Sequence, residues 1–177
     1  MKQNSLPFLS HCRTMSVSVC ALALSLSMAR AETTENLEKT FTIKPGGQLV
    51  VEVDFGAIEV TTHAGDQVSI HVSRGTKADE QAFLQDCPVT LTQEGDTVNV
   101  HSKSEAKNIW SSHGRQRTKG KYTIAVPAQF NARLKTSGGD IEVRDVQGEL
   151  KVNTSGGGIE VTGGGESWVV THPKIRK

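Results

Sequence analysis

Hydrophobic and polar residues alternate along most of the chain from about residue 41 onward. This period of two is typical of strands that bury one face and expose the other. Glycine-containing turn sequences at residues 45–47, 64–66 and 94–96 separate the alternating segments. The inward positions of four predicted strands are Leu49, Val51 and Val53; Val68, Ile70 and Val72; Val98 and Val100; and Tyr122, Ile124 and Val126. The pattern predicts an all-β domain.

One stretch departs from this pattern. The sequence Thr76-Lys77-Ala78-Asp79 has the form of a capping box, which favours the start of a helix. We expect a short helix through about Gln85, with Ala82 and Phe83 facing inward and Pro88 ending it.

A repeat occupies the C-terminal third of the chain. The segment TSGGDIEV at residues 136–143 recurs at 154–161 as TSGGGIEV, at an offset of 18 residues. Each unit is too small to bury its own apolar face, so neighbouring copies must stack. The fold prediction is therefore an irregular strand-rich N-terminal part with one short helix, leading into a short two-sheet β-solenoid with an 18-residue repeat.

The same offset aligns the apolar positions of successive rungs. The predicted partners are Leu134 with Val152, Ile141 with Ile159, Val143 with Val161, Leu150 with Trp168, and Val152 with Val170. A third rung then begins at Ser167 and lacks its second half. The sequence leaves open whether basic residues cap this end or the chain is shorter than the architecture it began.

The glycines of the repeat predict tight corners. We expect positive φ angles among Gly138, Gly139, Gly156 and Gly157, with Thr and Ser hydroxyls bonded to the turn backbone. Calcium-binding β-rolls also have glycine-rich repeats, but they need an aspartate in every repeat. Here Asp140 of the first repeat is replaced by Gly158 in the second. No metal or other cofactor is expected.

The first 31 residues have the features of a signal peptide. Basic residues precede an uncharged apolar run at 15–28, which is too short to span a bilayer and is followed by Ala29-Arg30-Ala31. We expect cleavage before Glu32 and export to the periplasm or beyond the cell. The predicted organisation is a signal peptide at 1–31, a linker at 32–40 and one adhesin-like all-β domain at 41–177, with its repeats at 130–171.

Removal of the signal peptide changes the charge and the cysteine count. It leaves 17 basic residues against 19 acidic ones, a formal charge of −2, which does not favour nucleic acid as a partner. Only Cys87 remains, and it is expected to be a small buried residue; one thiol cannot close an internal disulfide.

No catalytic constellation is found in the sequence. Glu142 and Glu160 alternate with inward residues, so they are expected to form a solvated ladder on an outer face. His71 and His101 are also out of phase with their buried neighbours, and no Gly-x-Ser-x-Gly motif occurs. The sequence therefore predicts a protein without enzymatic activity.

The chain resembles the DUF4097 family of adhesin-like β-strand repeat proteins. The resemblance is carried by the segments GGQLVVEVDFGAIEV (46–60) and YTIAVP (122–127) and by the repeats, over roughly Phe41 to Val161. It implies an exported all-β fold and supplies no catalytic residues. Members usually continue through further repeats.

Two functions remain as hypotheses. The first is a structural or adhesion module of the cell envelope that acts through sheet faces and edges. The second is binding of an anionic glycan or lipid through the basic segment 103–121, which carries a local charge of about +5. Its candidate contact residues are Arg115, Arg117, Lys119 and Lys121, with Trp110 as an anchor.

Overall fold

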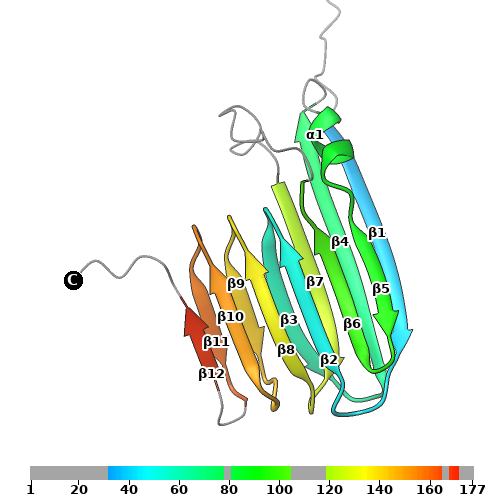
Figure 1. Ribbon diagram of the computed structural model, residues 1–177, viewed down its shortest axis with the longest axis vertical. Helices are drawn as coiled ribbons and strands as arrows, with labels where there is room; N and C mark the ends of the chain where they lie inside the picture. The colour runs from blue at the N-terminus through cyan, green and yellow to red at the C-terminus, as the bar shows by residue number, and fades with distance from the viewer. Residues whose placement is uncertain (1–31, 78–80, 105–118, 165–167, 172–177) are drawn as a thin grey trace, which may run out of the picture.

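Two six-stranded sheets pack face to face in the computed structural model, which describes residues 32–77, 81–104, 119–164 and 168–171 (Figure 1). Sheet A has the order β1 (Glu32–Thr42), β4 (Gln67–Lys77), β7 (Lys119–Pro127), β3 (Ala57–His63), β9 (Ile141–Arg144) and β11 (Ile159–Thr162). Sheet B has the order β12 (Trp168–Thr171), β10 (Leu150–Thr154), β8 (Asn131–Thr136), β2 (Gln48–Val53), β6 (Thr97–Ser102) and β5 (Thr90–Glu94). The prediction of an all-β fold is confirmed.

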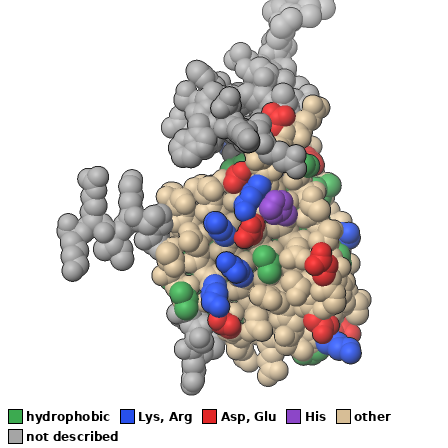
Figure 2. All heavy atoms as spheres, in the orientation of Figure 1, with side chains coloured by type: hydrophobic (Ala, Val, Ile, Leu, Met, Phe, Trp, Pro, Cys, Tyr) green, Lys and Arg blue, Asp and Glu red, His purple; other side chains and the backbone are tan. Residues whose placement is uncertain are grey.

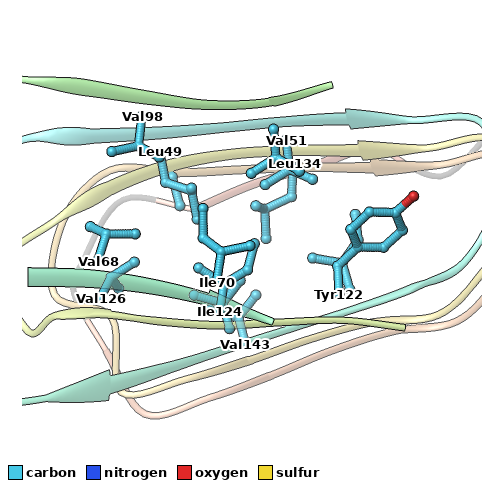
Figure 3. Close-up of a cluster of buried hydrophobic side chains, with 14 of the residues drawn as sticks. Leu49, Val51, Val68, Ile70, Val98, Tyr122, Ile124, Val126, Leu134 and Val143 are labelled. Carbon is cyan, nitrogen blue, oxygen red and sulfur yellow. The ribbon is translucent and has the colours of Figure 1, made fainter. Parts of the chain in front are cut away.

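The core lies between the two sheets, where the inward positions of the alternating segments meet (Figure 3). Every residue predicted to face inward on the four predicted strands is buried, from Leu49 on β2 to Val126 on β7. These strands are β2, β4, β6 and β7. The alternation in the sequence therefore identifies the buried face of each of these strands. Cys87 is also fully buried, as expected, and burial raises the pKa of its thiol.

The 18-residue offset is the pairing register of the C-terminal strands. Strand β10 runs parallel to both β8 and β12, and β11 runs parallel to β9. Val152 lies opposite Leu134 and Val170, and Ile159 lies opposite Ile141, as the alignment predicts. Each repeat therefore supplies one strand to each sheet.

The N-terminal strands are more regular than the sequence suggested. Val51 on β2 pairs with Leu134, and Ile58 on β3 pairs with Ile141, so both strands join the repeats at a constant offset of 83 residues. The segment β2–β3 is therefore a further copy of the same unit. A sequence signal existed, because Gly-x-Ile-Glu-Val occurs at 56–60 as well as at 139–143 and 157–161.

Side chains in the turns bind the next rung. The carboxylate of Asp140 accepts a hydrogen bond from the backbone N–H of Gly158 (2.7 Å), and the side-chain oxygen of Asn131 accepts one from Glu149 (2.8 Å). Thr154 donates to the carbonyl of Gly139 and accepts from the N–H of Gly157. The expected bonds between threonine and the turn backbone are confirmed, and they link successive rungs.

The predicted reason for the repeat glycines is wrong. The positive φ angles lie at other positions, and neither Gly139 nor Gly157 has one. A Cβ added at Gly139 would lie 2.1 Å from the carbonyl oxygen of Gly56, and one at Gly157 would lie 2.0 Å from that of Gly139. Glycine is needed here because consecutive backbones approach too closely for a side chain.

Two boundary predictions are also corrected. The helix α1 spans Gln81–Asp86, and Thr76 and Lys77 belong to β4 instead of a capping box, because β4 pairs with β1 through Lys77. Residues 32–40, expected to be a linker, form most of β1, which pairs with β4 along its full length.

The signal peptide prediction concerns residues outside the described part of the chain. Among the residues that the structure describes, no helix is long and apolar enough to cross a membrane.

Candidate interaction surfaces

The predicted contact residues fall in two groups. Trp110, Arg115 and Arg117 lie outside the described residues, so their arrangement stays a prediction. Lys119 and Lys121 are exposed on β7 of sheet A, two residues apart on the same side of the strand. The Nζ of Lys121 lies 2.7 Å from a carboxylate oxygen of Glu59 on β3.

An acidic row crosses the outer face of sheet A. The strand registers place in one line Glu38, His71, Thr123, Glu59, Glu142 and Glu160. Glu59 is paired with Lys121, and Glu142 is paired with Arg144 on its own strand. The hydrogen bond from Lys121 lowers the pKa of the Glu59 carboxyl, and the bond to Glu142 raises the pKa of the Arg144 guanidinium. The two central acids of the row are thus matched with local cations.

The outer face of sheet B carries a cluster of cations over β8 and β10. Lys151 on β10 lies directly opposite Arg133 on β8, and Lys135 lies two residues further along β8 on the same face. All three side chains are exposed. Figure 2, which views this sheet face, shows lysine and arginine gathered over β8 and β10. We call Arg133, Lys135 and Lys151 the basic patch.

Acidic neighbours compensate the basic patch only in part. Glu52 on β2 lies opposite Lys135, but its carboxylate is 2.5 Å from the Nζ of Lys103. The hydrogen bond from Lys103 lowers the pKa of the Glu52 carboxyl, and Lys135 acts on it only at longer range. Lys151 has an exposed partner in Glu149 at 2.7 Å.

A shallow groove of about 340 Å³ lies on the outer face of sheet A, over β1, β4 and β7. Small and polar side chains line much of it, among them Thr40, Ser69, His71, Thr123 and Ala125. Among the described residues, no group of three or more His, Cys, Asp or Glu side chains could hold a metal ion.

One buried charge ties the two sheets together. Arg74 on β4 is 1% exposed and reaches across the core to Ser102 on β6, while its Nε donates to Glu35 on β1 at 3.0 Å. It also donates to the carbonyl oxygen of Cys87 at 2.5 Å. We did not predict this residue, although Arg74 continues the inward phase of β4, and that signal could have identified it.

The hydroxyl of Tyr122 is buried near this end of the core and has no hydrogen-bond partner within the described ranges (Figure 3). Burial raises the pKa of the Tyr122 hydroxyl.

No family model matches the chain, and a search of curated proteins finds no match. Several solved structures are loosely similar, and three of them illustrate the likeness. A "putative cell adhesion protein" from Clostridium sporogenes is 9% identical, with 78% of this chain and 99% of that chain covered and a TM-score of 0.38. A "putative adhesin" from Bacteroides fragilis is 12% identical, with 72% and 61% covered and a TM-score of 0.38.

The third is a "putative lipid binding protein" from Parabacteroides distasonis, 14% identical, with 76% and 59% covered and a TM-score of 0.29. This chain therefore spans about three fifths of the second and third of these proteins. Because the identities and TM-scores are low, the similarities assign neither a fold family nor a function to it.

Proposed function

We propose that this chain is an exported, non-enzymatic module of the cell envelope that acts through its outer sheet faces and strand edges, as adhesin-like proteins do. The observation that carries the proposal is the contrast between the interior and the surface. The interior is a continuous apolar core, whereas the outer faces present charged rows in a fixed register. Such surfaces suit recognition of extended partners more than chemistry on a small substrate.

The proposal includes export by a signal peptide that is cleaved before Glu32. It rests on the features of residues 1–31, where basic residues precede an uncharged apolar run that is followed by Ala29-Arg30-Ala31. Mass spectrometry of the extracytoplasmic protein tests this. An intact Met1 or a lipid-modified Cys20 would contradict it.

We further interpret the stacked units as a short two-sheet β-solenoid. Support comes from the parallel pairing of equivalent residues in successive units, at an offset of 18 along both β8–β10 and β9–β11. In this interpretation each strand of a rung belongs to a different sheet, so the outer faces extend by one row with every rung.

Binding of labelled cell-envelope fractions to the purified protein tests the proposed function. Saturable binding without turnover of envelope glycans or lipids is the expected result. Absence of binding, or release of soluble products from the fractions, would contradict it.

The second candidate is recognition of an anionic partner through segment 103–121. Lys119 favours it, because its side chain is exposed. Lys121 is engaged by Glu59 and contributes less free charge. A variant in which Arg115, Arg117, Lys119 and Lys121 are replaced by Gln decides between the two, since only the second candidate requires loss of binding.

A further inference from the structure

We propose that the outer face of sheet B binds a linear anionic polysaccharide through the basic patch of Arg133, Lys135 and Lys151. This inference rests on the proposed function and names the surface and the chemical class of its partner. It moves the binding site from the predicted segment 103–121 to a sheet face.

The two outer faces differ in how their neighbouring like charges are compensated. On sheet A, Glu59 and Glu142 stand side by side, and each has its own cation. On sheet B, Arg133 and Lys151 also stand side by side, but Arg133 has no ion pair among the described residues, and neither has Lys135. Glu149 pairs with Lys151 and Glu52 acts on Lys135 at longer range, so the compensation of the patch is only partial. Adjacent like charges repel, so the patch favours an external anion.

The pairing of β8 with β10 sets the spacing of the three cations. Neighbouring strands lie about 4.8 Å apart, so Lys151 and Arg133 follow one another at that interval across the sheet. Lys135 is two residues from Arg133 along β8, roughly 6.6 Å away. A linear polymer of uronic acids carries one carboxylate on each ring, so a single chain can offer anions to both Arg133 and Lys151.

Polar side chains continue the rows of the basic patch on the neighbouring strands. The row of Lys135 continues through Asn153 and Thr171, and the row of Arg133 continues past Val50 to Asn99. Amide and hydroxyl groups can bond to sugar hydroxyls. Membrane-binding surfaces instead combine basic charge with large apolar or aromatic groups. Among the described residues of this face, the apolar side chains are the valines Val50 and Val169. These neighbours favour a glycan over a lipid surface.

The test compares two triple variants of the full chain that lose the same residue types. R133Q/K135Q/K151Q removes one arginine and two lysines from the patch. K119Q/K121Q/R144Q removes the same types from exposed positions on sheet A, and Lys119 and Lys121 are the described candidate contact residues of the predicted basic segment. Polygalacturonate is the probe, with dextran as the neutral control, and melting temperatures confirm folding.

We expect the patch variant to bind polygalacturonate about tenfold more weakly, since three exposed charge contacts are lost. Its affinity should also depend less on salt. The sheet A variant should bind within about twofold of the wild type. Equal losses in both variants, no loss in either, or equal binding of dextran would overturn the proposal. If the patch variant does not fold, the single variants K135Q and K151Q are tested by the same criteria. Each should then lower the affinity for polygalacturonate by a few-fold.

Two further measurements separate this inference from the proposed function. Binding to phosphatidylglycerol vesicles that is stronger than binding to polygalacturonate and equally sensitive to the patch would overturn the choice of a glycan. Binding of envelope fractions without binding of polygalacturonate would overturn this inference and leave the proposed function intact. Failure of both kinds of binding would overturn both.

Discussion

The two ends of the strand stack are finished in different ways. At the end formed by β1 and β5, side chains join the sheets: Lys39 donates to the carbonyl of Leu91 at 3.0 Å, and Gln93 donates to that of Thr42 at 3.0 Å. At the end formed by β11 and β12 (Figure 1), no such bond joins the two strands among the described residues, and Val169 and Val170 are both 50% exposed.

The comparison shows that repetition alone does not complete a core. The repeat positions are equivalent in sequence, but Ile141 is buried and its partner Ile159 is only half-buried, because β11 has no described neighbour on its far side. The first end departs from the repeat, using antiparallel strands and polar side chains to close the sandwich. Unpaired strand edges otherwise invite association with other chains.

The largest expected effect separates the interior from the open end. Ile141→Ala should reduce the free energy of unfolding by roughly 2 to 5 kcal/mol, as for other buried isoleucines. Ile159→Ala should cost about 1 kcal/mol, since part of that side chain already meets water. Glu142→Ala, a change at the surface, should stay within about 0.5 kcal/mol. Urea midpoints decide, and equal values for the two isoleucine variants would contradict the difference between interior and end.

The next effect tests how the closed end is held. Arg74→Met should reduce the free energy of unfolding by about 3 kcal/mol, because Glu35 loses its buried partner and the carbonyl of Cys87 loses a donor. Lys39→Met removes an exposed cross-link and should cost less than about 1 kcal/mol. Thermal unfolding followed by circular dichroism measures both. A larger loss for Lys39→Met would mean that the exposed contacts close this end.

Close approach of the rungs gives a third contrast. Gly139→Val should cost about 1 to 3 kcal/mol, because its Cβ meets the backbone of Gly56 in the middle of the stack. Gly157→Val should cost less, since β11 has no described strand on its far side that would resist a shift of this rung. Chemical denaturation of both variants is the measurement. If neither midpoint changes, close stacking does not explain these glycines.

The smallest expected effect concerns the buried hydroxyl of Tyr122 on β7, which has no described hydrogen-bond partner. Tyr122→Phe removes a buried donor without a described partner, so stability should stay the same or rise by up to about 1 kcal/mol. Differential scanning calorimetry can resolve a change of this size. A clear loss of stability would show that the hydroxyl is satisfied in solution and belongs to the network around Arg74.

Much of the fold could be predicted from local sequence. Period-two alternation identified the buried residues of four strands, and the offset of 18 gave the register of β8 with β10 and of β9 with β11. These predictions succeed because side-chain direction alternates along any strand and equivalent residues stack in parallel pairing.

The sequence also identified Glu142 and Glu160 as outward residues, and their row crosses sheet A as expected. The basic patch was missed because β8 contributes only two of its residues and β10 only one. Arg133, Lys135 and Lys151 gather only when β8 and β10 pair, whereas the basic residues of the predicted segment 103–121 already lie close together in the sequence.

By itself, the sequence determined which face of each strand is buried and how the repeats align, because both follow from local periodicity. Only the tertiary structure decided that residues 32–40 form a strand and that this strand pairs with β4. It also decided that Arg74 closes the core and that Gly139 is required by a neighbouring backbone. These features depend on contacts between residues far apart in the chain, which alternation and spacing do not encode.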